Sequence, residues 1–135
     1  MGKVIYSKIN VIQQDKGDIF KILTNDSVGF DKFGEAYYSN INFNEIKGWK
    51  KHLKMQCILI PVSGDVDVVT YNLESNQFEK FKLNIKDPYR LVIPPNIIFG
   101  FKGNEISNCI LNIGNILHDP EESLTYNLNE FKYNW

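Results

Sequence analysis

The sequence predicts an all-β protein that folds as an antiparallel sandwich or barrel. Its apolar segments are short, recur roughly every 8–12 residues and are separated by Gly, Pro and Asn, as strands joined by turns are. No segment longer than about ten residues shows the 3.6-residue period of an amphipathic helix. The chain has 135 residues, which suits one domain and is too short for two, so we expect residues 1–135 to form a single domain.

Turn signals divide the chain into its expected strands. The cluster DKGD at 15–18 separates the first two β-branched stretches. The triplet SGD at 63–65 predicts a tight hairpin, and Pro61 just before it implies either a sheet edge or a bulge. The expected strands are 4–11, 19–23, 35–43, 57–62, 66–71, 78–83, 89–93, 97–101 and 106–113, followed by a polar tail at 119–135.

The composition excludes several classes of function. Fifteen Lys and Arg against sixteen Asp and Glu give a net charge of −1, which provides no basic surface for nucleic acid. No run of about 18 apolar residues predicts a membrane span, and the first residues lack the apolar core of a signal peptide. Cys57 and Cys109 are too few for a disulfide framework and are expected to be buried thiols in a reducing compartment. We therefore expect a soluble, cytoplasmic protein.

Two segments resemble the paired motifs of the cupin jelly roll, an antiparallel double-sheet barrel. They are GWKKHLKMQ at 48–56 and IPPNIIF at 93–99. Residues two apart on a strand point to the same side, which lets metal-binding cupins gather histidines and a glutamate around one divalent ion. The four matching positions hold Lys50, His52, Gln56 and Phe99. Only the histidine among them is a competent ligand, so we expect no metal and no other cofactor.

A closer resemblance is to the sugar-nucleotide branch of the cupins, the dTDP-4-dehydrorhamnose 3,5-epimerase superfamily, and to its short members. The similar segments follow one another in the family's order: 15–19, 33–39, 46–49, 93–95, 100–102 and 118–122. Each is weak alone, but together they span most of residues 15–127. The resemblance implies a jelly-roll barrel, usually dimeric, that binds a nucleoside-diphosphate 4-keto sugar.

This family removes a proton from the carbon next to the keto group. It uses a histidine base oriented by an aspartate, a lysine that stabilises the enolate oxygen and a tyrosine that returns a proton, because a carbon acid reacts when base and oxyanion stabiliser act together. Carried over to this sequence, these four positions fall on Lys50, Asn127, Cys57 and Asn112 respectively, and a further family histidine is replaced by Phe99. The resemblance thus implies a retained substrate site with an altered acid–base set.

Lys50 and His52 are the candidate catalytic residues. Strand alternation places them on one face, where they would meet the same ligand. A lysine shielded from water can act as a base, although a solvated strand charge is the alternative for Lys50 and a hydrogen-bonded structural role the alternative for His52. Tyr37 and Glu35 share a face that, by the resemblance, lines the cavity and contacts substrate, although Tyr37 would serve equally as a core aromatic.

Two functions remain open from the sequence. The first is a nucleotide-sugar epimerase or isomerase of surface polysaccharide biosynthesis, with Lys50 in place of the base histidine. The second is a non-catalytic cupin that binds a sugar or nucleotide sugar or assists a partner enzyme. The expected ligand is a nucleotide sugar, dTDP-linked by the resemblance, with no nucleic acid and no membrane as partner. A homodimer is expected as well, since the strand-forming residues within 1–14 leave an open edge.

Overall fold

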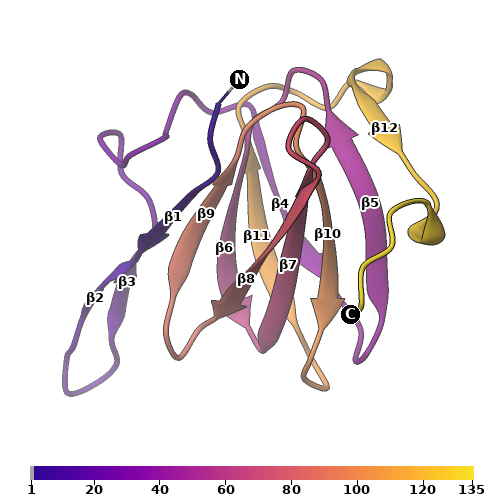
Figure 1. The fold of residues 1–135 in the computed structure, drawn as a ribbon. Coiled ribbons are helices and arrows are strands. Elements are labelled where there is room, and N and C mark those ends of the chain that lie inside the picture. The colour runs from indigo at the N-terminus through magenta and orange to yellow at the C-terminus, as the bar shows by residue number, and fades with distance from the viewer. Residues whose placement is uncertain (1) are drawn as a thin grey trace.

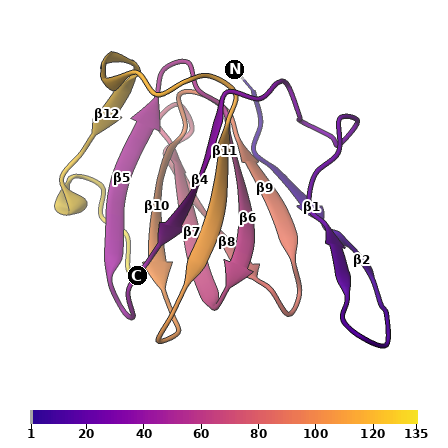
Figure 2. The same ribbon diagram turned by 180° about the vertical axis from the view of Figure 1, so that it is seen from behind.

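The computed structural model describes residues 2–135 and contains two five-stranded antiparallel sheets that face each other (Figures 1 and 2). The first sheet has the order β1 (Ile5–Lys8), β9 (Tyr89–Ile93), β6 (Cys57–Ser63), β11 (Cys109–Gly114) and β4 (Glu35–Asn40). The second has the order β12 (Ser123–Thr125), β5 (Ile46–His52), β10 (Ile98–Gly103), β7 (Asp65–Asn72) and β8 (Gln77–Asn84). This arrangement confirms the expected all-β double-sheet jelly roll.

Within residues 2–135, four short elements lie outside the two five-stranded sheets. Strands β2 (Asn10–Ile12) and β3 (Ile19–Lys21) pair with each other and form a hairpin that projects away from the barrel (Figures 1 and 2). Two turns of 3₁₀ helix, η1 (Pro120–Glu122) and η2 (Leu128–Glu130), flank β12 in the C-terminal segment. Residues 2–135 include no helix with the length and apolar character that crossing a membrane requires.

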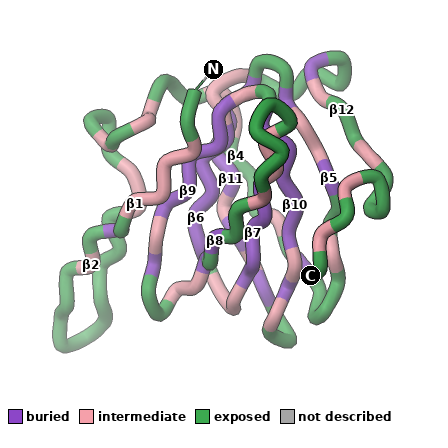
Figure 3. Tube along the Cα trace, in the orientation of Figure 1, coloured by how far each residue is buried: buried purple, intermediate pink, exposed green. Residues whose placement is uncertain are grey.

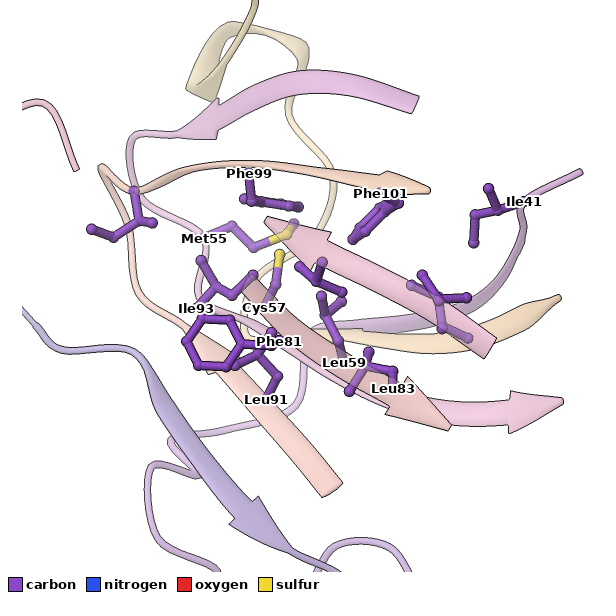
Figure 4. Close-up of a cluster of buried hydrophobic side chains, with 14 residues drawn as sticks. Ile41, Met55, Cys57, Leu59, Phe81, Leu83, Leu91, Ile93, Phe99 and Phe101 are labelled. Carbon is purple, nitrogen blue, oxygen red and sulfur yellow. The ribbon is translucent and has the colours of Figure 1, made fainter. Parts of the chain in front are cut away.

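The main core fills the space between the sheets (Figure 4). Strand β6 shows how the period of two builds it: Cys57 and Leu59 point into this core, whereas Ile58 and Ile60 point to the outer face of the first sheet. All four side chains are at least 97% buried. A strand covered on both faces explains why 57–60 is continuously apolar instead of alternating.

Each sheet also carries an apolar cluster on its outer face. Ile22, Leu23 and Phe30 cover the first sheet. Aromatic residues of the C-terminal segment cover the second sheet around Trp49, which is fully buried. Figure 3 shows the burial of the central strands beneath these coverings. The tail expected to be polar at 119–135 therefore contributes an apolar layer.

The observed strands and turns differ from the expected ones at several places. The stretch 4–11 divides into β1 and β2 around the buried Ile9. Pro61 lies in a central strand, so the edge interpretation is wrong, and the register shift opposite Cys109 and Ile110 supplies the alternative bulge. The hairpin at 63–65 is present, with Gly64 at φ 75°, a conformation that favours glycine. Residues 106–108 precede β11 instead of belonging to it.

Candidate active site in the barrel

A hollow of about 250 Å³ opens between the sheets, where β4 and β11 face β5 and β10. Its lining residues are Tyr37, Ser39, Lys47, Gly48, Lys50, His52, Phe99, Phe101 and Asn112. Lys50, His52, Tyr37, Phe99 and Asn112, all expected at the site, therefore come together at one place. Three larger hollows, of about 510, 530 and 330 Å³, lie elsewhere on the surface, and none of them contains a histidine or a pair of cations.

A β-bulge in β5 brings a second lysine to the hollow. Lys50 pairs with Phe99 and Lys47 pairs with Phe101, so two residues of β5 stand opposite one residue of β10. The extra residue lets Lys47 and Lys50 both face the hollow, three positions apart, while Trp49 faces outward. Strict strand alternation would put Lys47 on the face opposite to that of Lys50, which is why the sequence did not indicate Lys47 as a site residue.

The bulged lysine also links the two walls of the hollow. Lys47 Nζ donates a hydrogen bond to Ser39 Oγ on β4 at 3.1 Å. No carboxylate lies among the lining residues, so the two ammonium groups give the hollow a positive charge. Neither lysine forms an ion pair with another residue of the described chain. Such a hollow favours an anionic ligand.

His52 is held by a carboxylate that sequence reasoning missed. Its Nδ1 lies 2.5 Å from Oε1 of Glu122, and the two residues are 6% and 2% exposed. The imidazole also stacks on the Phe99 ring, with centroids 6.0 Å apart. No hydrogen bond joins Nε2 to any residue within 2–135, and His52 lines the hollow, so Nε2 is the nitrogen left for a ligand.

The surroundings keep Glu122 ionised. Burial opposes ionisation, but the bond with His52 and the bonds that Oε2 accepts from the backbone N–H groups of Lys54 and Met55, each 3.1 Å, together lower the pKa of Glu122. An ionised Oε1 requires the hydrogen on Nδ1, and this fixes the imidazole tautomer whose Nε2 is basic.

The C-terminal segment delivers Glu122 through its own pairing. Strand β12 pairs with β5 so that Ser123 lies opposite His52, and the preceding residue reaches the imidazole. Asp119 begins η1 by accepting the Glu121 N–H at 3.0 Å, and Pro120 occupies the first helical position. The sequence HDPEE at 118–122, which resembles the family, predicts a turn, but nothing in that pattern indicates the contact of Glu122 with His52.

Tyr37 and Asn112 form the opposite wall. They are directly opposite each other in the pairing of β4 and β11, and Asn112 Nδ2 donates to Tyr37 Oη at 2.9 Å. Burial, with the nearby Cys57 and Glu35, raises the pKa of Tyr37 to about 12 against the opposing hydrogen bond. The phenol therefore keeps its proton and is a donor toward the hollow.

The three other expected site residues do not line the hollow. Cys57 is fully buried, and burial raises its pKa to about 12, so it is a thiol beneath the site and not a nucleophile. Glu35 accepts the backbone N–H of His118 at 2.7 Å and orders the loop after β11. Asn127 is exposed at the start of η2, and no carboxylate from that position reaches the site. Glu122, five residues earlier, is the acid that contacts a histidine.

Residues 2–135 contain no cluster of three or more His, Cys, Asp or Glu side chains able to hold a metal ion. The side chains at the hollow offer one imidazole fixed by a carboxylate, two ammonium groups and a phenol that keeps its proton. Together they can remove a proton and stabilise the negative charge that results.

Comparison with known proteins identifies structures similar to this one. No family model and no curated protein sequence matches the chain. Among solved structures, a dTDP sugar isomerase from Desulfovibrio desulfuricans G20 is 25% identical with a TM-score of 0.90, covering 98% of this chain and 90% of that one. A TDP-quinovose 3,4-ketoisomerase from Campylobacter jejuni is 22% identical with a TM-score of 0.79, covering 97% and 98%. A dTDP-6-deoxy-D-glucose-3,5-epimerase from Legionella pneumophila is 14% identical with a TM-score of 0.83, covering 94% and 74%.

These similarities show that the chain has the cupin fold, a jelly-roll barrel. Within that class, the chain has the fold of the sugar-nucleotide branch, whose members among the similar structures are dTDP-sugar epimerases and isomerases. The resemblance indicated by the sequence segments is confirmed.

Proposed function

We propose that the protein isomerises or epimerises the keto sugar of a dTDP-linked nucleotide sugar, starting with proton removal next to the keto group. The observation that carries this proposal is the buried His52–Glu122 pair beside a hollow that contains two lysines. A histidine with one nitrogen fixed by an ionised carboxylate and the other free is arranged as a general base. The activities of the similar proteins support the substrate class.

The charge of the hollow supports a diphosphate-bearing ligand. Lys47 and Lys50 present two cations with no carboxylate among the lining residues. The volume of about 250 Å³ is below the roughly 300–1,000 Å³ typical of sites that enclose a drug-sized ligand. We therefore place the sugar ring inside, the diphosphate beside Lys47 at the wall shared with Ser39, and the nucleoside toward the surface.

In the proposed first step, His52 Nε2 takes the proton from the carbon next to the ketone. The electron pair of that C–H bond forms a C=C bond, and the ketone oxygen becomes an enolate whose charge Lys50 compensates. Tyr37, which keeps its proton, donates a hydrogen bond to a sugar oxygen. This assignment moves the base from position 50, where the family resemblance placed it, to His52, and gives Lys50 the oxyanion role.

The second half of the reaction distinguishes the two outcomes. Epimerisation returns a proton to the same carbon from the other face. Ketoisomerisation returns it to the former carbonyl carbon while the neighbouring hydroxyl oxygen becomes the new ketone, so one carbon is oxidised and the next reduced without an external oxidant. The chain spans 98% of the Campylobacter ketoisomerase and 74% of the Legionella epimerase, which supports isomerisation. A place in surface polysaccharide biosynthesis is supported by the family resemblance.

The test follows hydrogen exchange in deuterated water. The protein is incubated with dTDP-4-keto-6-deoxyglucose, and proton and carbon NMR record deuterium incorporation and the position of the ketone. We expect exchange next to the ketone and a new ketone signal at the neighbouring carbon. His52→Gln should lower the rate by about 10²–10⁴, as expected for loss of a general base, and Lys50→Met by about 10²–10³, as expected for loss of an oxyanion stabiliser.

His118→Gln is the matched control, because His118 is the second histidine of the chain and is exposed. It should exchange deuterium like the unmodified protein. Binding of the nucleotide sugar without any exchange would overturn the catalytic proposal and establish the non-catalytic sugar-binding alternative.

A further inference from the structure

The outer face of β5 carries an aromatic cluster that the proposed reaction does not use. Trp49 is fully buried there beneath the C-terminal segment. Its ring centroid lies 5.2 Å from that of Trp135 and 6.2 Å from that of Phe131, the latter at an interplanar angle of 85°. Tyr126 and Tyr133 complete the layer. We call residues 126–135 the aromatic clamp.

Hydrogen bonds tie the clamp to β5 and β10, two neighbouring strands of the second sheet. The Tyr126 N–H donates to the Trp49 carbonyl at 2.9 Å, and Trp49 Nε1 donates to the Leu128 carbonyl at 3.0 Å. Lys102 Nζ donates to the Trp135 carbonyl at 3.3 Å. The clamp is therefore fixed at its start, middle and end, although it has no strand of its own.

The clamp packs on the bulge itself. A Cβ atom added to Gly100, the single residue opposite the bulge, would lie 3.0 Å from the Lys47 carbonyl oxygen, 3.3 Å from the Trp49 ring and 3.4 Å from the Trp135 ring. The bulge, its partner residue and the clamp thus meet without spare space. The outward direction of Trp49 and the inward direction of Lys47 and Lys50 are two consequences of this one arrangement.

We propose that the aromatic clamp is a positioning element, which holds the β5 bulge so that Lys47 and Lys50 face the hollow and keeps Glu122 against His52. Glu122 and the clamp belong to one continuous segment, joined by β12, which pairs with β5 alongside Lys50 and His52. Docking of the clamp and occupation of the hollow are therefore coupled. The proposal relies on the proposed function only for the identity of the ligand.

The first experiment compares Trp135→Ala with Trp135→Phe and with Phe33→Ala. Phe33 is a control aromatic, 68% exposed and outside the cluster. In Trp135→Ala, kcat/KM for dTDP-4-keto-6-deoxyglucose should fall at least tenfold, since a displacement of about 1 Å is enough for losses of this size. Trp135→Phe should remain within about threefold of the unmodified protein, and Phe33→Ala should be unchanged. A folded Trp135→Ala protein with unchanged kcat/KM would overturn the proposal.

The second readout needs no turnover. The His52 Nδ1 proton, held by Glu122, should give a slowly exchanging NMR signal in the unmodified protein and in Phe33→Ala. Trp135→Ala should lose that signal through faster exchange. Retention of the signal in a folded Trp135→Ala protein would contradict the link between the clamp and the His52–Glu122 pair, whatever the ligand is.

The third readout uses the unmodified chain and covers the case in which Trp135→Ala does not fold. Coupling between two sites is reciprocal, so dTDP bound in the hollow should slow amide hydrogen exchange within 126–135 at least threefold. Bound dTDP with unchanged exchange in the clamp would overturn the coupling. If dTDP does not bind at all, the proposed function fails, and Phe131→Leu, a milder change within the clamp, decides the clamp proposal separately: its His52 Nδ1 proton should exchange faster than in the unmodified protein, and an unchanged signal would contradict the clamp.

Discussion

Replacing Glu122 by glutamine tests the arrangement of the site with the smallest change of shape. The carboxylate accepts three hydrogen bonds, one from His52 Nδ1 and two from the backbone N–H groups of Lys54 and Met55. A glutamine has one oxygen for these three donors. Whichever way its amide turns, it loses at least one bond, and its NH₂ group faces either the imidazole or two N–H donors.

The magnitude follows from that count. Hydrogen bonds to a charged group contribute about 1.5–3 kcal/mol each, and breaking a buried ionic pair costs about 3–5 kcal/mol, so Glu122→Gln should lower the unfolding free energy by about 2–4 kcal/mol. With the oxygen toward the backbone, the NH₂ group requires an imidazole that carries its hydrogen on Nε2. That tautomer cannot remove a proton, and we expect kcat to fall by about 10²–10⁴.

The pH dependence gives a third check. The hydrogen bonds of Glu122 lower its folded-state pKa below the ordinary 4.5, although burial opposes this shift. Ionised Glu122 therefore stabilises the folded protein fully above pH 4.5, and this stabilisation is lost as the pH falls through the lower folded pKa. The glutamine variant has no such titration. Urea unfolding at pH 7 and pH 3 should show the difference between the two proteins shrinking in acid. Equal stabilities and equal kcat at pH 7 would refute the role assigned to Glu122.

Three further predictions concern other residues. Tyr37→Phe removes the acceptor of the Asn112 amide and the proposed donor to the sugar. Urea unfolding should show the unfolding free energy lowered by about 0.5–1.5 kcal/mol, and kinetics should show kcat lowered at least tenfold. Unchanged values in both measurements would contradict the role of Tyr37 in the wall of the hollow. A thiol reagent at pH 8 should modify Cys109 in the folded protein and leave Cys57 unreacted, because Cys57 is fully buried and its pKa is raised to about 12. Rapid modification of both thiols would disprove the burial of Cys57. Light scattering at micromolar concentration should give the mass of a dimer. Phe20→Asp should lower that mass, because Phe20 is an exposed apolar residue on the projecting β2–β3 hairpin. A monomer mass for the unmodified protein would reject the dimer.

Most of the fold could be predicted from the sequence, because short apolar segments separated by Gly, Pro and Asn leave few architectures open. The strand expected at 57–62 and the turn at Gly64 were both predicted from such local signals. The stretch around β5 was harder, since its pattern of Lys and Trp reflects the bulge and not a simple alternation. The aromatic residues near the C-terminus were interpreted as a polar tail because asparagine and charged residues separate them.

Part of the site was predicted for a physical reason: residues on paired strands at the correct spacing must meet. Lys50 and His52 share a face, and the family resemblance implied that Tyr37 and Asn112 belong to the substrate site, where the structure shows them on the opposite wall. The pair of His52 with Glu122 joins residues 70 positions apart. It depends on a three-residue strand and one turn of 3₁₀ helix, both too short for a pattern to predict. A position-by-position transfer from the family therefore selected Asn127 instead.

The location of Glu122 has a consequence for how such proteins could diverge. The residues that line the hollow, including both lysines, come before position 115, whereas the carboxylate that contacts His52 belongs to the segment after it. Exchanging only residues 119–125, with the aromatic clamp kept, would remove the carboxylate from His52 while the lining of the hollow stayed unchanged. A catalytic protein and a binding protein could then share one barrel and differ only in the short segment that carries Glu122.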